Sequence, residues 1–205
     1  MSNIDYNRKY LEIISNLQHK PKLLLHSCCA PCSSAVLEQV VEHFDVTLFY
    51  YNPNITDEEE YRKRFEELQR FVREAHNASI PVIDGGYEPE AFFKIAKGLE
   101  EVPEGGKRCT LCYHQRLAAT AKLAKSEGFD YFTTTLSISP YKDAQRLNRI
   151  GGALAKQHNV NYLYSDFSNC FERSIELSKK YNLYLQDYCG CIYSIAYGVP
   201  QGGSK

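Results

Sequence analysis

The chain has 205 residues, of which 43% are hydrophobic and 24% are charged, and its formal net charge is −1 at pH 7. This length and composition predict one domain with a full-sized core over residues 1–205. The near-zero charge excludes a globally basic nucleic-acid binder, although a local basic patch remains compatible with it. Residues 1–20 are too polar for a secretory signal, and no apolar run reaches the roughly 18 to 20 residues that span a bilayer. We therefore expect a cytoplasmic protein with no membrane partner.

Apolar runs that are typical of strands alternate along the chain with helical patterns. Residues 1–20 are expected to form an N-terminal extension or helix. The strand-like runs are short, rich in aromatic and β-branched residues, and bounded by turn formers. They predict strands at 22–27, 44–51, 79–84, 130–136 and 160–167. We expect a helix after each, and a flexible tail over residues 196–205.

Helix boundaries follow from capping and breaking residues. The clearest helix is expected to begin at Thr56, because Thr56 and Glu59 form a capping-box pair and apolar residues then recur every three or four positions. A helix over about 109–128 ends at a glycine that suits a left-handed stop. A third is predicted over about 139–158, where serine and proline provide a cap and a first helical residue. Residues 171–181 predict a fourth.

This alternation favours right-handed β-α-β units and therefore a Rossmann-like, three-layer α/β sandwich of the HUP-like type, with a parallel sheet of about five strands. In such folds ligands bind beyond the carboxyl ends of the strands, beside helix N-termini. The segment "HSCCAPCSS" at 26–34 follows the first strand, so its thiols are expected at that edge. Because the segment contains no glycine, it is not a glycine-rich phosphate loop.

Seven of the eight cysteines fall into three short motifs, which suggests metal or redox chemistry in a reducing compartment. In "CTLC" the two sulfurs leave the same face of a helical turn. In "YCGC" the central glycine permits a sharp turn that points both thiols one way. The motifs contain Cys28, Cys29, Cys32, Cys109, Cys112, Cys189 and Cys191.

The number of thiols restricts the kind of metal site. A tetrahedral zinc site or a four-iron, four-sulfur cluster takes four thiolates, and the remaining three match a catalytic metal with an open position. Two structural zinc sites account for the number almost as well, and spacing does not assign each cysteine to a site. A redox dithiol at Cys29 and Cys32 would leave the other motifs without a role. Cys170 stands alone and is expected to be a buried hydrophobic residue.

Five blocks of the sequence, in order, resemble the QueH family of epoxyqueuosine reductases, the cobalamin-independent type. They are "HSCCAPC", "YYNPNI" followed by "EYRKR", "GLEEVPEGGKRCTLCYHQRL", "TTTLSISPYKD" and "LYLQDYCGCIYS", and they run from about residue 22 to 194. The resemblance implies an oxidoreductase of queuosine biosynthesis that removes the epoxide oxygen of epoxyqueuosine at the tRNA wobble position. It also implies a [4Fe-4S] cluster, one mononuclear metal ion, iron before zinc, and an external electron donor. The alternatives are a non-enzymatic zinc module that binds RNA and a tRNA-modifying ATP pyrophosphatase or thiolase relative.

The resemblance places all seven motif cysteines at the metal site. It makes Cys32 the candidate ligand of the mononuclear metal, because the family also carries aspartate at that position. Deoxygenation of an epoxide consumes two protons, and Tyr113, His114 and Asp187 flank the thiols as candidate donors. Asp187 is equally compatible with a hydrogen bond to a metal ligand, and His114 with a structural role.

Contacts with tRNA are expected from two sets of residues. Basic side chains beside the family motifs are phosphate candidates, namely Lys107, Arg108 and Lys142. Residues that end the second strand are expected to stack on and hydrogen-bond a splayed-out wobble base, namely Tyr50, Tyr51 and Asn52. The chain departs from the family at "SNCFE" before "RSIELS", a stretch that is usually longer and more basic, and at Leu185, where arginine is common. Both changes remove positive charge and so weaken the expectation of tRNA contacts from that region.

Overall fold

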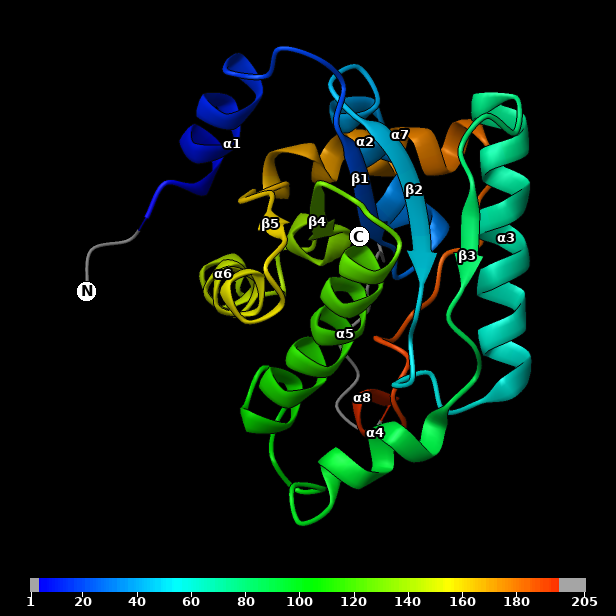
Figure 1. Cartoon of the computed structure of the whole chain (residues 1–205). Helices are drawn as coiled ribbons and strands as arrows, with labels where there is room; N and C mark the ends of the chain where they lie inside the picture. Colours follow the sequence, from blue (N-terminus) through cyan, green and yellow to red (C-terminus); the bar gives the residue numbers. More distant parts are fainter. Residues whose placement is uncertain (1–3, 196–205) are drawn as a thin grey trace.

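The computed structural model describes residues 4–195, in which five parallel strands form one sheet between two layers of helices (Figure 1). The strands are β1 (Lys22–His26), β2 (Asp45–Tyr50), β3 (Val82–Asp84), β4 (Tyr131–Thr134) and β5 (Asn161–Tyr162). Their order in the sheet is β3-β2-β1-β4-β5. The expected Rossmann-like α/β class is confirmed, and each strand is shorter than the apolar run that predicted it.

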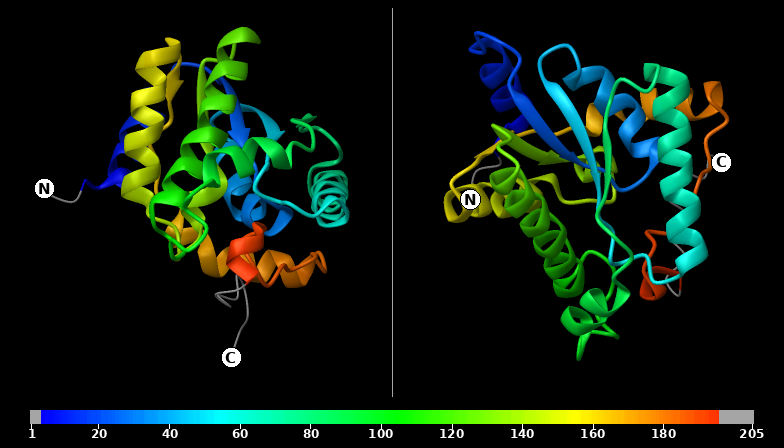
Figure 2. Two further views of the ribbon diagram at one scale, coloured as in Figure 1. Left: turned by 90° about the horizontal axis from the view of Figure 1, so that it is seen from below. Right: turned by 45° about the vertical axis from the view of Figure 1, so that its right-hand side comes forward.

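Alternation along β1 explains why both faces of the sheet are covered. Leu23 and Leu25 belong to one core and Leu24 to the other, because successive side chains point to opposite faces. Three helices cover most of the first face, namely α2 (Ala30–Val40), α3 (Glu58–His76) and α7 (Phe171–Lys180), and α1 (Tyr6–Ser15) packs against the same core through Tyr10. Two cover the second face, α5 (Lys107–Ser126) and α6 (Ala144–His158). The two layers lie on opposite sides of the sheet in Figure 2.

Two predicted helix starts are wrong. Helix α3 is capped one residue after Thr56, by Asp57, whose carboxylate accepts a hydrogen bond from the Glu60 amide at 2.8 Å. Helix α6 begins five residues after the predicted serine, at Ala144, and is capped by Asp143. In both cases an aspartate provides the cap, and its negative charge suits the positive end of the helix dipole. The segment before α6 is instead a 3-10 helix, η1 (Thr135–Ile138), followed by a turn.

Three helices complete the secondary structure with a short 3-10 turn, η2 (Ser168–Cys170). Helix α1 (Tyr6–Ser15) lies in the segment expected to be an extension or helix, whereas α4 (Pro89–Ala96) and α8 (Ile192–Ile195) were not expected. The predicted flexible tail at 196–205 lies outside the described residues. Among the described helices, none is long and apolar enough to cross a membrane.

The strand order places a topological switch point beside β1. The chain leaves β1 toward β2 on one side, and β4 pairs with β1 on the other side. All strands point their carboxyl ends toward the region of α4 and α8 (Figure 1). Loops after β1, β2 and β4 and the start of α5 therefore converge at one edge, where ligands bind in open α/β sheets.

Candidate metal centre

The loop after β1 brings three thiols together at the switch point. Cys28 and Cys29 precede α2, and Cys32 lies in its first turn. The three Sγ atoms lie within 4.8 Å of one another, and those of Cys28 and Cys29 are 3.7 Å apart. Sulfurs bonded at about 2.3 Å to one tetrahedral ion are separated by about 3.8 Å. Cys28, Cys29 and Cys32, called here the Cys trio, therefore have the spacing of ligands to one metal ion.

The surroundings of the Cys trio favour negative charge on one of its three sulfurs, that of Cys28. Hydrogen bonds from Cys29 and Cys32 hold the pKa of Cys28 well below its usual value. The same bond to Cys28 raises the pKa of Cys29 to about 12, and that of Cys32 also rises. The three thiols therefore do not all ionise on their own, whereas a bound cation would draw the protons from all of them. Gln186 Nε2 also donates to Cys29 Sγ at 3.1 Å.

Four further thiols line one cavity that is built from two distant segments. Cys109 and Cys112 lie one turn apart at the start of α5, and Cys189 and Cys191 lie in the turn before α8. Gly190 between them has φ +115°, and a Cβ there would approach Ile55 Cγ1 at 2.9 Å. Glycine is thus required for the turn that places both thiols. We call Cys109, Cys112, Cys189 and Cys191 the Cys quartet.

Two members of the Cys quartet lie in apolar surroundings. Cys112 and Cys191 pack with Phe92 and Ala96 of α4. Burial raises the pKa of Cys112 to about 12, and it also raises the pKa of Cys109 and Cys191. The amide of Gly105 donates to Cys109 Sγ at 3.3 Å, as a backbone group does to a metal-bound sulfur. Buried protonated thiols that face one cavity match a site whose protons leave when metal binds.

Three residues line both the quartet cavity and a neighbouring small cavity that contains Cys28 and Cys32: Arg116, Lys142 and Cys189. Lys142 Nζ donates to Cys189 Sγ at 3.0 Å and lies 3.5 Å from Glu104 Oε1. Burial opposes the charged ammonium, but the neighbouring Cys189 sulfur keeps the pKa of Lys142 well above its usual value. The Cys trio and the Cys quartet are therefore adjacent, and two buried cations lie between them.

A hydrogen-bond network positions Arg116. Its Nη2 donates to Asn52 Oδ1 at 2.5 Å, and its Nε donates to His26 Nε2 at 3.3 Å. Asn52 Nδ2 in turn donates to the carbonyl of Ser27, at 3.0 Å. Burial, and then the charge of Arg116, lower the pKa of His26 to about 3, so the imidazole is neutral. Asn52, which was expected to contact a base, thus holds a guanidinium beside the thiols.

The sequence analysis did not single out Arg116, although its spacing from Cys112 indicates a position beside the thiols. Arg116 follows Cys112 by four residues on α5, so both side chains leave the same face of the helix. The guanidinium is buried, and the sulfurs of Cys112, Cys28 and Cys189 lie near it. A cation on the thiol-bearing face of a helix is a sign of charge compensation, which the sequence motifs alone did not suggest.

The other basic candidates lie in different environments. Arg108 is buried, and its Nη1 donates to three carbonyl groups of the segment 99–102. Lys142 is buried in the site, as described above. Lys107 alone of the three is exposed. The internal partners of Arg108 and Lys142 leave Lys107 as the basic candidate that faces solvent.

The aromatic candidates and the proton-donor candidates also differ in burial and in distance from the cavities. Tyr50 is fully buried and Tyr51 nearly so, and their hydroxyls donate to internal acceptors at 3.1 and 3.0 Å. Tyr113 lines the quartet cavity, and burial raises its pKa, so the phenol keeps its proton. His114 and Asp187 are exposed. The structure therefore brings Tyr113, and not the other two proton-donor candidates, into the cavity.

A Rossmann-like sheet with seven clustered thiols at its carboxyl edge defines a cysteine-rich, metal-binding α/β protein. A family model described as epoxyqueuosine reductase QueH matches residues 23–197. The chain therefore belongs to the epoxyqueuosine reductase QueH family, a family of oxidoreductases, which confirms the resemblance found in the sequence.

Similar proteins cover most of the chain. The protein named epoxyqueuosine reductase QueH from Staphylococcus epidermidis is 43% identical over 201 residues, which are 93% of this chain and 84% of the relative. The protein of that name from Streptococcus pyogenes serotype M1 is 40% identical over 180 residues, covering 85% and 71%. The one from Thermotoga maritima is 33% identical over 178 residues, covering 84% and 90%.

Proposed function

We propose that this protein is a cytoplasmic reductase that converts epoxyqueuosine to queuosine at the wobble position of tRNA, with a [4Fe-4S] cluster on the Cys quartet and a mononuclear metal ion on the Cys trio. One observation carries the proposal. Seven thiols divide into the Cys quartet, which lines one cavity, and the Cys trio, two of whose members line the adjacent cavity, and Cys189 lines both cavities. Four thiolates are the number that a cubane cluster takes, and three leave one position of a tetrahedral ion open.

The described residues fit both groups. Lys142 and Arg116 supply positive charge between the cavities, which offsets the negative charge of several thiolates. Cys112 and Cys191 pack against apolar side chains, which shields these two thiols from water. Cys32 of the Cys trio lines two pockets, one of which has exposed side chains at its mouth. Four thiols around one cavity suit an iron-sulfur cluster, and three thiols beside a pocket that reaches solvent suit an ion that a substrate can approach.

The reaction takes up two electrons and two protons and releases the epoxide oxygen as water, leaving an alkene. When bound, the metal groups would supply single electrons from an external donor and a Lewis acid for the epoxide oxygen. Among the chain's own groups, Lys142 holds a positive charge between the two cavities, and Tyr113 holds a phenolic proton at the quartet cavity. Tyr113 is therefore our candidate proton donor, and Cys32 our candidate ligand beside the substrate.

The first experiment is anaerobic purification followed by iron, sulfide and zinc analysis and a visible spectrum. We expect absorbance near 400 nm and about five irons for four sulfides. The variant Cys32→Ala should lose about one iron, keep the cluster absorbance and lose turnover of epoxyqueuosine-containing tRNA. A colourless zinc protein that stays colourless after reconstitution with iron and sulfide would refute the proposal and support a zinc module that binds RNA.

A further inference from the structure

An apolar pocket opens beside the Cys trio, and the chemistry described so far does not use it. It lies between the start of α2, the turn after η1, and α7, and has an internal volume of about 100 Å³ below an open mouth. Cys32 and Gln186 line it, together with Tyr141, Phe171 and Leu185. The pocket is called here the α7 pocket.

The inner end of the α7 pocket reaches the metal centre. Cys32 and Gln186 also line the small cavity that contains Cys28 and Cys189. Gln186 donates its amide N–H to Cys29, and its Oε1 is buried without a hydrogen-bond partner among the described residues. An unpaired buried acceptor is costly. The inner end thus offers one acceptor to a hydroxyl or N–H group that lies next to Cys32.

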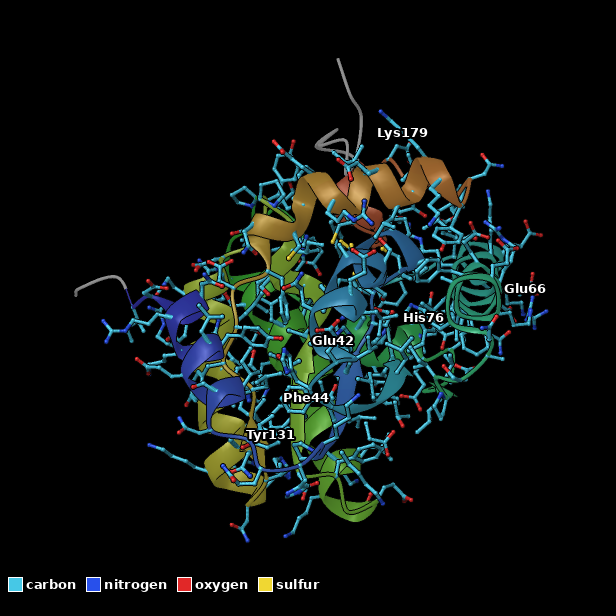
Figure 3. The ribbon with its side chains drawn as sticks, turned by 90° about the horizontal axis from the view of Figure 1, so that it is seen from above. Glu42, Phe44, Glu66, His76, Tyr131 and Lys179 are labelled. Carbon is cyan, nitrogen blue, oxygen red and sulfur yellow. The ribbon has the colours of Figure 1, made fainter. Side chains whose placement is uncertain are left out.

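The mouth of the α7 pocket is apolar and exposed. Tyr141 is 53% exposed and Leu185 is 49% exposed, and both are among the large hydrophobic side chains that the described structure leaves in solvent. Two such side chains around one pocket mark a binding site more than scattered ones do. Lys179 adds an exposed ammonium to the rim and lies at the outer side of α7 in Figure 3.

From solvent inward, the α7 pocket presents a cation, apolar side chains, a hydrogen-bond acceptor and a thiol of the Cys trio. This arrangement matches a nucleotide whose phosphate lies at the rim, whose base lies against the apolar side chains and whose modified arm reaches the thiol. A cation suits a backbone phosphate, and an exposed aromatic ring suits an unstacked base. The earlier aromatic candidates cannot provide that surface in this structure, because Tyr50 and Tyr51 pack inside the protein. Tyr141 is a tyrosine near the thiols whose side chain is largely free of the core.

We propose that the α7 pocket binds the flipped-out epoxyqueuosine nucleoside, with its base against Tyr141 and Leu185 and its epoxide-bearing arm toward Cys32 and Gln186. Lys179 then lies near a flanking phosphate. This inference rests on the proposed function and adds the residues that select the modified base. Base flipping is required because the reacting ring must leave the anticodon stack to reach a buried metal.

The test uses metal-loaded protein and two anticodon stem-loop RNAs, one with epoxyqueuosine and one with guanosine at the wobble position. Wild-type protein should bind the epoxyqueuosine RNA more tightly. Tyr141→Ala should reduce that preference about tenfold, because stacking of one base on an aromatic ring accounts for about this much affinity. Leu185→Ala should reduce it as well, because one apolar wall of the pocket is lost. Tyr141→Phe should retain the preference, because the ring remains.

Leu11→Ala is the matched control, because Leu11 is 52% exposed on α1 and does not line the pocket. Its preference and metal content should equal those of wild type. If wild-type protein shows neither preference nor turnover, the proposed function fails and the pocket assignment fails with it. If wild type prefers and reduces the modified RNA while Tyr141→Ala and Leu185→Ala behave like Leu11→Ala, only the pocket assignment is overturned.

Discussion

The Cys trio and the Cys quartet are built in different ways. The trio comes from one loop and one helical turn, so local structure after β1 brings its sulfurs together. The quartet joins the start of α5 to a turn near the described end of the chain, so its geometry depends on the packing of distant segments. Metal on the quartet should therefore contribute to folding stability, whereas metal on the trio should affect mainly the chemistry.

The largest effect should come from breaking the quartet. Cys112→Ser should remove about four irons, abolish turnover and lower Tm, because the cluster no longer ties the C-terminal turn to α5. Cys32→Ala should lower turnover equally but leave Tm close to that of wild type. Iron analysis and thermal unfolding of both variants check this contrast. Equal Tm losses in the two variants would contradict a folding role confined to the quartet.

Lys142→Met tests the charge between the two groups. The substitution leaves the Glu104 carboxylate buried without its ammonium partner, and loss of one member of a buried pair costs about 3 to 5 kcal/mol. We expect a free energy of unfolding lower by that amount, measured by denaturant titration, together with weaker cluster retention. The double variant with Glu104→Gln should recover part of the stability. If the double variant recovers no stability, loss of the Lys142–Glu104 pair is not the cause of the lower free energy of unfolding.

Gly190→Ala tests the turn of the quartet. A side chain at φ +115° that meets Ile55 should cost about 1 to 3 kcal/mol and reduce iron content. Gly128→Ala is the control, because Gly128 also has positive φ but an added Cβ meets nothing within 4 Å. Both variants should lose stability, and only Gly190→Ala should lose iron. Iron loss in both would mean that general destabilisation empties the site.

The smallest effect is a difference in thiol reactivity in metal-free protein. Because the pKa of Cys28 is lowered and that of Cys112 is raised to about 12, a larger fraction of Cys28 than of Cys112 should be ionised at pH 7. Alkylation at pH 7 should therefore label Cys28 before Cys112, and peptide mass spectrometry reads the order. Since only thiolates react, the difference in labelling rate between Cys28 and Cys112 should become smaller as pH rises. Preferential labelling of Cys112 would reverse the assignment of charge.

The sequence predicted features that depend on local patterns. The strands, the parallel sheet and the position of the first thiol motif follow from alternation and turn residues, and the structure agrees. The division of the thiols into four and three depends on how the segment with Cys189 packs on α5, which spacing does not encode. The buried positions of Arg116 and Lys142 were also beyond sequence reasoning, because a charged residue is normally exposed.

The contacts of Arg108 join two segments of the chain that are distant in sequence. Its guanidinium binds three carbonyl groups before α5, and it lies 4.6 Å from the centre of the Tyr193 ring in α8. Arg108, which lies on α5, thus contacts both the segment before α5 and helix α8, and the quartet cysteines lie beside these elements. Extracellular proteins often make such a connection with a disulfide, which would consume thiols that a metal needs. Here the hydrogen bonds and the ring contact of Arg108 hold these segments together, and all four quartet sulfurs remain available as metal ligands.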